Sequence, residues 1–388
     1  MMRDGKDLFT LGDAGRVISP TSFATMVKPA GSTCNLGCTY CYYLKKAELY
    51  GGREPVMDEA LLELYIRQYI DANDADEVSF CWHGGEPLLL GMEFFEKAVA
   101  LQRKYAGGKR ILNSLQTNGM KVNERWCDFF RENNFLIGLS LDGPKFIHDA
   151  YRRTRTGGDT FDKVMYAAGL FRRYGVEFNT LSVVNRMCEG HGREIYRFFR
   201  DEVGSRYMQF LPAANERLPW AVSGKGYGQF LIDVFDEWVK RDVGSFYVQI
   251  FDATLAQWCG ITPGVCSVNE VCSDSLTVEH NGDVYPCDHF VSPETCLGNI
   301  REKTLREIYD SPKRLRFALS KRNDLPDECF RCKFYSVCHG GCPEHRVDGR
   351  KVLCEGMSAF FEHVTPAMDR MKELLEQGKA PAEIMAGE

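Results

Sequence analysis

The sequence lacks the features that would direct it to a membrane or to nucleic acid. It has no apolar run of about 18 residues, the length at which a helix becomes a candidate to span a bilayer. Residues 1–20 contain no apolar stretch typical of a secretory signal. No Lys- or Arg-rich run is present and the net charge is −6, whereas a nucleic-acid partner normally requires a basic surface. We therefore expect a cytoplasmic protein with no membrane and no nucleic acid among its partners.

The chain is long and apolar enough to build a large core. Of its 388 residues, 44% are hydrophobic and 12% are aromatic, a composition that argues against disorder. This length suits one domain of about 200 residues or more together with a smaller second domain.

Strand-like and helix-like segments alternate from residue 22 to about residue 245. Six runs are rich in β-branched and aromatic residues, at positions 23–28, 77–82, 110–116, 135–141, 176–184 and 206–211. Six other segments have apolar residues at helical spacing, at positions 57–71, 93–105, 124–133, 160–174, 193–202 and 227–241. The alternation predicts an α/β fold with parallel strands and right-handed crossovers. Six units form a partial (β/α)6 TIM-like barrel, with its chemistry at the carboxyl ends of the strands.

The alternating pattern ends near residue 245, where cysteines and turns become frequent. Only short helices, at 304–309 and 358–375, are readable beyond this point. We predict a flexible N-terminal arm over residues 1–21, the barrel over 22–245 and a cysteine-rich domain over 246–388. Something other than a large apolar core must stabilise the last of these.

The 16 cysteines are grouped in a way that indicates metal, because clustered cysteines in a reducing cytoplasm bind metal more often than they pair. Cys34, Cys38 and Cys41 follow the first predicted strand with CxxxCxxC spacing, which can wrap one iron–sulfur cluster. Three thiolates leave one iron of a [4Fe–4S] cluster open. S-adenosylmethionine (SAM) can chelate that iron through its amino and carboxylate groups. Zinc is the alternative metal for these three thiolates, but a tetrahedral zinc site needs a fourth ligand and the loop contains none.

A second motif, with the sequence GGEP, follows the second predicted strand. Gly84 and Gly85 allow the backbone to approach a ligand closely, and Glu86 is expected to accept a hydrogen bond from the SAM ammonium group. A turn of this composition is common on its own. Its position downstream of CxxxCxxC is what favours SAM.

The tail contains eight further candidate ligands, enough for two fully ligated four-iron clusters. They are Cys266, Cys272, Cys287, Cys329, Cys332, Cys338, Cys342 and Cys354. Two structural zinc sites would use the same thiolates, but redox clusters suit an enzyme that must dispose of electrons. The remaining cysteines are expected to behave as small buried hydrophobes, namely Cys81, Cys127, Cys188, Cys259 and Cys296.

These motifs together resemble the radical SAM superfamily with a SPASM tail, and more narrowly the anaerobic sulfatase-maturating enzymes. The resemblance covers nearly the whole chain after residue 22. It rests on the Lys28-Pro29 pair, CxxxCxYC, GGEP and the segments 113–119, 138–144, 209–210, 285–288, 297–300 and 329–342.

The resemblance implies three [4Fe–4S] clusters and SAM as cofactors. It assigns one auxiliary cluster to Cys266, Cys272, Cys287 and Cys342, and the other to Cys329, Cys332, Cys338 and Cys354. Because the two sets interleave, neither cluster forms unless the whole tail folds. The implied SAM contacts are Tyr40, Gly85, Ser140, Arg152 and Ala214. Arginine can pair with the SAM carboxylate, whereas Ala214 offers only backbone or apolar contact.

The implied reaction is oxidation of a Cys or Ser side chain in a sulfatase polypeptide, within a Cys/Ser-x-Pro/Ala-x-Arg motif, to Cα-formylglycine. A 5′-deoxyadenosyl radical removes a hydrogen from Cβ, a base takes the thiol or hydroxyl proton, and one electron leaves through an auxiliary cluster. Reduced flavodoxin or ferredoxin is the implied electron donor. Asp288, next to Cys287, is the candidate base. Tyr43 is a second catalytic candidate, and His83 and His289 rank below Asp288.

Two other functions stay open at this point. A SPASM enzyme that crosslinks or epimerises a ribosomal peptide would share the motifs, although such enzymes often carry an N-terminal peptide-recognition domain and only residues 1–22 precede the first strand here. A zinc-stapled binding protein without catalysis would share the cysteines.

Overall fold

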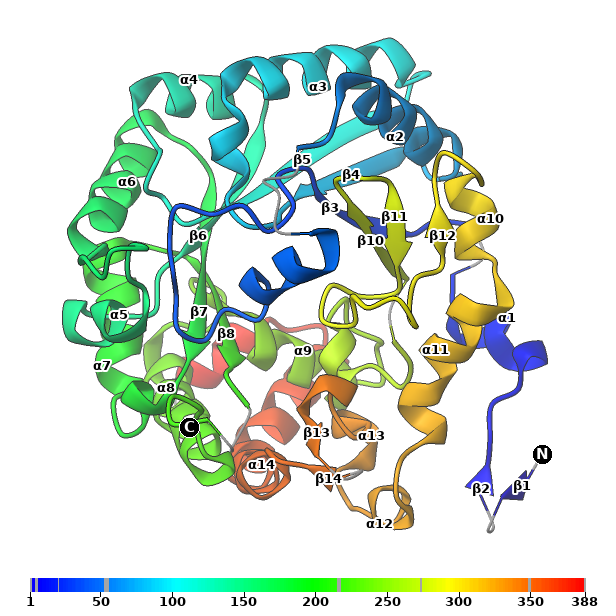
Figure 1. Ribbon diagram of the computed structural model, residues 1–388. Helices are drawn as coiled ribbons and strands as arrows, with labels where there is room; N and C mark the ends of the chain where they lie inside the picture. Colours follow the sequence, from blue (N-terminus) through cyan, green and yellow to red (C-terminus); the bar gives the residue numbers. More distant parts are fainter. Residues whose placement is uncertain are drawn as a thin grey trace.

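A single ten-stranded sheet forms the centre of the molecule. The computed structural model describes residues 2–3, 6–19, 21–51, 56–214, 218–272, 274–347 and 350–386. The strand order is β12-β11-β10-β3-β4-β5-β6-β7-β8-β9. The sheet curves into an open ring with helices on its outer side (Figure 1). All neighbours from β10 to β9 are parallel, and β11 and β12 are added antiparallel. The predicted partial barrel is confirmed.

The six strands expected from the sequence lie within two residues of their predicted bounds. They are β3 (Ala24–Lys28), β4 (Glu77–Trp82), β5 (Arg110–Thr117), β6 (Phe135–Ser140), β7 (Phe178–Val184) and β8 (Tyr207–Pro212). Five expected helices are also present, as α2 (Glu59–Asp71), α3 (Met92–Tyr105), α4 (Glu124–Glu132), α6 (Phe161–Tyr174) and α8 (Gly224–Arg241). The helix expected at 193–202 differs: α7 (Gly192–Arg197) widens into a π-helical turn over Phe198–Val203, in which the consecutive Phe198 and Phe199 are both buried. A further helix, α5 (Lys145–Tyr151), follows β6.

Local sequence explains where the helices begin and which face they bury. At the start of α2, the Asp58 side chain accepts the Leu61 N–H at 2.7 Å, as expected for an Asp N-cap. The apolar face of α2 packs inward, with Tyr65 fully buried and its hydroxyl 2.6 Å from Thr25 Oγ1 of β3. On β4, Trp82 is fully buried and donates to Asn113 of β5 at 2.8 Å. Buried polar groups are thus paired across neighbouring elements.

The barrel sheet continues past the expected boundary at residue 245. Four short strands belong to it, namely β9 (Tyr247–Val248), β10 (Ser275–Glu279), β11 (Asp283–Tyr285) and β12 (Gly298–Asn299). β10 lies parallel to β3 in the register Val278 to Val27. Helix α9 (Gln249–Trp258) joins β9 to the cysteine-rich segment. The tail is therefore hydrogen-bonded directly to the first barrel strand, and the division of the chain into a barrel over 22–245 and a cysteine-rich domain over 246–388 stays a prediction.

The remaining tail elements are helical segments and one hairpin. They are α10 (Leu305–Tyr309), α11 (Pro312–Asn323), α12 (Asp327–Phe330), α13 (Tyr335–Cys338), the strands β13 (Arg346–Val347) and β14 (Arg350–Lys351), and α14 (Cys354–Glu376). In Figure 1 these elements, coloured from yellow to red, lie along the side of the ring that the barrel helices leave open.

Helices α8 and α14 cross in close backbone contact at glycines. A Cβ atom at Gly228 would lie 2.2 Å from the Gly356 carbonyl oxygen, and one at Gly356 would lie 1.8 Å from the Gly224 carbonyl oxygen. Only glycine permits this approach, so the C-terminal helix is fixed onto the barrel. Although α14 has 23 residues, no helix in the described ranges is long and apolar enough to cross a membrane.

Part of the N-terminal segment is packed, which differs from the expected flexible arm. Helix α1 (Ala14–Val17) places Ala14 in the core, and Ile18 is also buried. The Asn323 side chain accepts the Phe9 N–H at 3.0 Å and donates to the Phe9 carbonyl at 2.8 Å. The packed chain therefore begins near Phe9, before the expected boundary at residue 22.

Candidate functional site

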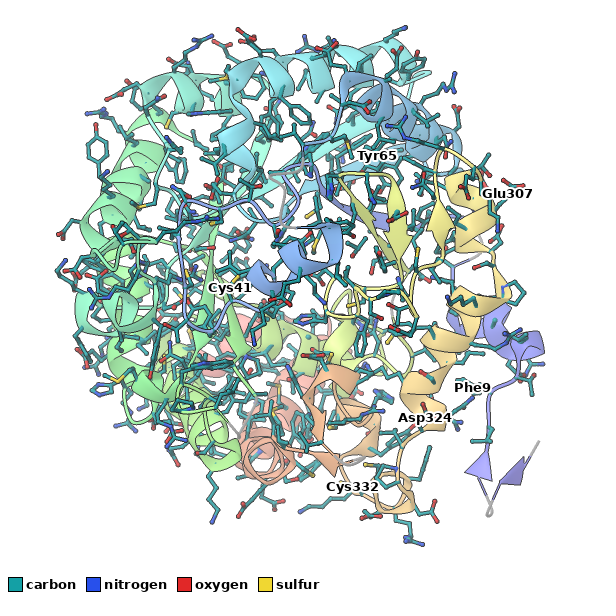
Figure 2. The ribbon with its side chains drawn as sticks, viewed as in Figure 1. Phe9, Cys41, Tyr65, Glu307, Asp324 and Cys332 are labelled. Atoms are coloured by element: carbon teal, nitrogen blue, oxygen red, sulfur yellow. The ribbon has the colours of Figure 1, made fainter. Side chains whose placement is uncertain are left out.

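The first three candidate cysteines lie on one loop that leaves the carboxyl end of β3. Figure 2 shows Cys41 over the middle of the ring and Cys332 in the tail. The Cys34 sulfur accepts the Leu36 N–H at 3.4 Å and the Asn118 side-chain amide at 3.6 Å. Burial raises the pKa of the Cys34 thiol to about 11 and that of Cys38 to about 12. An ionised thiolate without a partner is unfavourable at these buried positions, and coordination to iron would stabilise it. The loop therefore fits an iron–sulfur cluster.

The GGEP turn pairs with the loop that carries these cysteines. The Gly85 N–H donates to the Gly31 carbonyl at 2.8 Å, and the Glu86 N–H donates to the Thr33 carbonyl at 2.8 Å. A Cβ atom at Gly85 would lie 2.0 Å from the Thr33 oxygen, and Gly84 adopts φ +122°. The glycines are therefore required by the close approach of two protein segments. Sequence reasoning had attributed them to close approach of a ligand.

Glu86 is fully buried and its carboxylate is held by the protein. It accepts from the Thr117 hydroxyl at 2.8 Å, from the Asn118 N–H at 2.8 Å and from the Leu88 N–H at 3.1 Å. Burial raises its pKa to about 7. These contacts tie the end of β5 to the GGEP turn, and a contact of Glu86 with SAM stays a prediction.

The expected SAM contacts Tyr40 and Arg152 meet at a third residue, Asp142, which sequence reasoning missed. Arg152 Nε donates to Asp142 at 3.0 Å and the Tyr40 hydroxyl donates to the other carboxylate oxygen. The Val183 N–H also binds Asp142, at 2.9 Å. Arg152 is buried, with 7% of its surface exposed. A buried guanidinium held at one edge can present its other N–H groups to a carboxylate ligand.

Ser140 and Ala214 lie at the carboxyl ends of two barrel strands, β6 and β8, that are separated by β7. Ser140 ends β6, and its hydroxyl accepts from the Gln116 side chain at 2.9 Å. Ala214 follows β8 and packs, half-buried, against the core. Both positions are at the strand ends where barrel chemistry is expected.

Asp288 lies in a network of side chains from both halves of the chain. The fully buried Lys28 of β3 forms an ion pair with its carboxylate at 3.2 Å. The Tyr42 hydroxyl donates to the same carboxylate oxygen, and the His289 ring stacks on Tyr42 at 4.5 Å. Burial alone would raise the pKa of Asp288, but Lys28, His289 and Tyr42 hold it well below its ordinary value. Asp288 is therefore ionised at neutral pH.

Tyr43 is turned away from Asp288. Its hydroxyl donates to the buried Glu279 carboxylate at 2.6 and 2.8 Å, and Lys28 lies 4.6 Å from its ring centre. This placement favours a structural role, and the catalytic role expected for Tyr43 stays a prediction. Its neighbour Tyr42 makes the contact with the candidate base Asp288 that was expected of Tyr43. The two tyrosines are adjacent and follow the same cysteine, so the sequence could not show which of them faces Asp288.

His83 lies partly buried beside this network and is held neutral. Its Nδ1 accepts the Gly84 N–H at 2.7 Å and lies 3.1 Å from the Lys28 ammonium. Burial, with Lys28 nearby, lowers its pKa to about 3. Lys28 was visible in the sequence as one half of a Lys-Pro pair, but only the fold shows that it faces Asp288.

The eight tail thiols interact in two groups. Ionised Cys266 and Cys342 each raise the pKa of both Cys272 and Cys287, adding to the larger effect of burial. The pKa of Cys329 is likewise raised, mainly by burial and further by the nearby thiolates of Cys338, Cys354 and Cys332. These groups have the same membership as the two interleaved ligand sets that the resemblance implies, and the cluster assignment stays a prediction.

All sixteen cysteines are free thiols. Cys127 and Cys188 are buried, while Cys81, Cys259 and Cys296 are partly buried. Within the described residues, no three His, Cys, Asp or Glu side chains converge as ligands of a single metal ion would. The donor set of the eight tail thiols nevertheless fits iron–sulfur clusters, which take Cys thiolates as ligands.

Comparisons with known proteins match two parts of the chain to family models. Residues 29–199 match the radical SAM superfamily, and residues 266–333 match an iron–sulfur cluster-binding domain called SPASM. The first match contains the CxxxCxxC loop, the GGEP turn and Arg152. The second begins at Cys266 and contains Asp288.

Curated relatives match over nearly the whole chain. A serine-type anaerobic sulfatase-maturating enzyme of Bacteroides thetaiotaomicron is 44% identical over 93% of this chain and 94% of its own length. A cysteine-type enzyme of Clostridium perfringens is 37% identical over 88% of this chain and 96% of its own. A solved structure of native anSMEcpe with bound AdoMet and Cp18Cys peptide has a TM-score of 0.84 and 34% identity, and covers 91% of this chain and 99% of that one.

Proposed function

The chain belongs to the anaerobic sulfatase-maturating enzymes of the radical SAM superfamily, and we propose that it oxidises a Cys or Ser side chain of a sulfatase polypeptide to Cα-formylglycine. The observation that carries this proposal is the position of Asp288. Its ionised carboxylate adjoins the candidate cluster ligand Cys287 and is paired with Lys28 at the carboxyl end of a barrel strand. A candidate proton acceptor thus lies next to a candidate electron acceptor.

The barrel provides the groups that would hold the cofactors. Cys34, Cys38 and Cys41 would hold the first cluster, and the SAM contacts would come from Tyr40, Gly84, Gly85, Glu86, Ser140, Arg152 and Ala214. When bound, the cluster and SAM supply a 5′-deoxyadenosyl radical that abstracts a hydrogen atom from carbon. Asp142 orients Arg152 through a 3.0 Å hydrogen bond, so the guanidinium is already positioned before a carboxylate ligand arrives.

Asp288 would receive the thiol or hydroxyl proton of the target residue. Positioning comes first for a general base, and Lys28 and Tyr42 fix this carboxylate from two directions. Its low pKa keeps it deprotonated in the resting enzyme.

The tail would hold the two auxiliary clusters on the interleaved cysteine sets. The substrate would carry a Cys/Ser-x-Pro/Ala-x-Arg motif, and reduced flavodoxin or ferredoxin would supply the reducing electron. One relative is named as serine-type and another as cysteine-type, so both target residues belong to the proposal.

A peptide assay tests the proposal directly. The reduced, anaerobically purified enzyme is incubated with SAM and with matched peptides that carry Cys or Ser in the motif, and products are identified by mass spectrometry. We expect formylglycine in at least one peptide, with one 5′-deoxyadenosine for each oxidation.

The rival functions predict other products in the same experiment. Accumulation of 5′-deoxyadenosine without formylglycine in either peptide would contradict the proposal and favour an enzyme that crosslinks or epimerises a peptide. Stoichiometric zinc with no iron, and no SAM cleavage, would favour a zinc-stapled binding protein.

A further inference from the structure

Lys321, in the last turn of α11, is a buried cation that is paired with no carboxylate in the described part of the chain. Only 1% of its surface is exposed. Its ammonium group donates instead to main-chain carbonyls of the segment that starts at the candidate ligand Cys266, at 2.5 Å to Cys266 and also to Asn269. These neutral carbonyls satisfy the N–H donors but leave the charge uncompensated, which is unfavourable in a buried site.

The groups that offset this cost are thiolates of one ligand set. Burial lowers the pKa of Lys321 to about 8, and ionised Cys272, Cys266 and Cys342 act in the opposite direction. Helix α11 also fixes one of these ligands, because the Cys272 N–H donates to the Ala318 carbonyl at 3.1 Å. Ala318 and Lys321 are three residues apart and therefore lie on the same face of the helix. One helix face thus holds a candidate ligand and a positive charge beside each other.

Arg346, the first residue of strand β13, adds a second cation near thiols of both sets. Its guanidinium group donates to the Lys321 carbonyl at 2.8 Å. Burial lowers the pKa of Arg346, and ionised Cys272, Cys329 and Cys342 raise it; of these, Cys329 belongs to the second set. The buried Nε of Arg346 has no hydrogen-bond partner among the described residues. An N–H group in this position fits a sulfur acceptor of a bound cluster.

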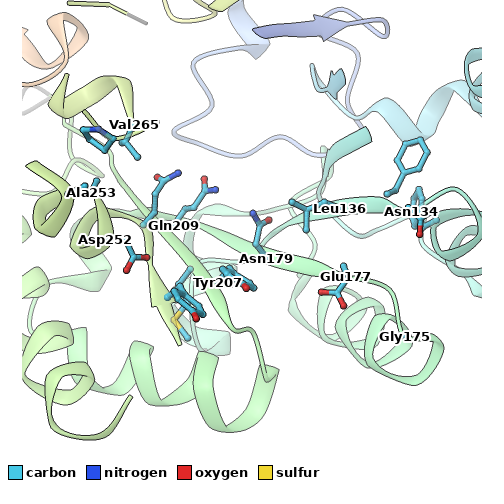
Figure 3. A pocket seen from close by; sticks show the side chains of 18 of the residues that line it. Asn134, Leu136, Gly175, Glu177, Asn179, Tyr207, Gln209, Asp252, Ala253 and Val265 are labelled. Atoms are coloured by element: carbon cyan, nitrogen blue, oxygen red, sulfur yellow. The ribbon is translucent and has the colours of Figure 1, made fainter. Parts of the chain in front are cut away.

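Lys321 approaches the first set from the protein interior, whereas the other side of this set borders solvent. Cys266 is exposed, and the preceding Val265 lies on the wall of an open concavity beside the barrel strands (Figure 3). Water and salt screen charges on that side. Lys321 is shielded from water, so its charge acts on the thiolates with much less screening.

We propose that Lys321 and Arg346 poise the two auxiliary clusters as electron acceptors by placing buried positive charge against both ligand sets. A cluster held by four thiolates gains one negative charge when it is reduced by one electron. Net charge and hydrogen bonds to the sulfurs are among the properties that set the reduction potential of such a cluster. Buried cations favour the more negative, reduced state and therefore raise the potential. The two residues act through the clusters and make no contact with the substrate.

The inference rests on the proposed function, in which one electron must leave the substrate. The 5′-deoxyadenosyl radical takes a hydrogen atom from Cβ, and Asp288 takes the thiol or hydroxyl proton. The remaining electron reduces an auxiliary cluster as the C=S or C=O double bond forms. The oxidised donor protein, flavodoxin or ferredoxin, then accepts this electron, which replaces the one spent in cleaving SAM. A higher cluster potential favours the transfer from the substrate.

A redox titration of the iron-loaded protein tests the proposal without any peptide. It is run in a Cys38→Ala background, so that only the auxiliary clusters contribute, and reduced clusters are measured by electron paramagnetic resonance. Lys321→Met removes the charge and keeps an apolar stem. At a fixed potential it should lower the ratio of reduced to oxidised cluster about tenfold for one of the two clusters, a downward shift of about 59 mV for a one-electron couple. Arg316→Met, which removes an exposed cation of the same helix, should leave both potentials unchanged because water screens that charge.

A pair of variants at Arg346 separates the effect of charge from an effect on folding. Arg346→Gln removes the charge and should lower the potentials of both clusters, whereas Arg346→Lys keeps the charge and should restore them. Iron analysis checks that each variant is loaded, and the Arg346 pair decides the question if Lys321→Met does not bind iron. Equal potentials in Arg346→Gln, Arg346→Lys and the parent protein would overturn the proposal.

Turnover of the full enzyme gives a second readout. Because the substrate electron leaves less readily, Arg346→Gln should form more than one 5′-deoxyadenosine for each formylglycine, and Arg346→Lys should return this ratio toward one. An unchanged ratio in Arg346→Gln would contradict the proposal. Failure of the proposed function has a different signature, because the wild type would then form no formylglycine while the titration would still show the shifts in potential.

Discussion

The barrel and the cysteine-rich tail share one sheet but are stabilised in different ways. In the barrel, long strands and helices bury aromatic and aliphatic side chains such as Trp82, Tyr65 and Phe130. In the tail, strands β11 and β12 have three and two residues, helices α10, α11 and α14 add apolar side chains to the same core, and eight candidate ligand thiols gather in two groups. From this difference we infer that burial stabilises the barrel, whereas the tail depends in addition on what its thiols bind.

One buried ion pair joins the two regions. Lys28 belongs to the first barrel strand, and Asp288 follows a tail ligand. The parallel pairing of β10 with β3 brings these two residues together from opposite ends of the chain. The candidate base is therefore positioned only when both regions are folded.

The largest expected effect comes from removing one tail ligand from each set. Cys272→Ala/Cys338→Ala should lose about eight of about twelve irons, as two four-iron clusters fail to form, and should expose the tail to protease. Cys38→Ala, a matched loss in the barrel loop, should lose about four irons and keep its protease resistance. Iron analysis with limited proteolysis measures both, and equal protease sensitivity in the two variants would contradict the contrast between the regions.

The next effect comes from breaking the ion pair between the regions. Lys28→Met leaves Asp288 as an uncompensated buried charge, which costs about 3–5 kcal/mol of unfolding free energy. The double variant Lys28→Met/Asp288→Asn removes that charge and should recover most of the loss. Denaturant unfolding of the four proteins in this cycle provides the measurement. Additive losses would show that the two residues are not energetically coupled.

A smaller effect separates the two adjacent tyrosines. Tyr43→Phe leaves the buried Glu279 without its donor and should cost about 1–3 kcal/mol of stability, while turnover per folded enzyme changes little. Tyr42→Phe should cost little stability, because its ring is partly exposed, and should slow peptide oxidation. Thermal melts and turnover numbers for the pair measure this. The reverse pattern would reinstate Tyr43 as the catalytic candidate.

The smallest effect concerns SAM binding in the barrel. Arg152→Lys keeps the charge but loses the planar fork, so SAM affinity should fall by about tenfold, or about 1.4 kcal/mol. Equilibrium SAM binding to the cluster-loaded protein measures it, with Arg153→Lys on the neighbouring exposed position as the control. Equal affinity in both variants would remove Arg152 from the SAM contacts.

The sequence predicted the barrel well because its signals are local and periodic. β4 and α3 have alternating or helical patterns long enough to be recognised, and the cysteine spacing is visible in the chain itself. β10, by contrast, is held by β3, which lies about 250 residues earlier. The two strands that follow it in the sheet, β11 and β12, are too short to show a period. Lys28 facing Asp288, Asp142 holding Arg152 and Glu86 tying the GGEP turn are contacts across the fold, so no local pattern could reveal them.

Turnover of a motif peptide by Asp288→Asn tests the central claim most directly, namely that Asp288 takes the proton of the target residue. The variant is loaded with iron and compared with the wild type for 5′-deoxyadenosine and for formylglycine. We predict intact iron content and SAM binding, with peptide oxidation slowed by roughly a hundredfold or more, as expected for loss of a general base. Formylglycine formation at the wild-type rate would contradict the account.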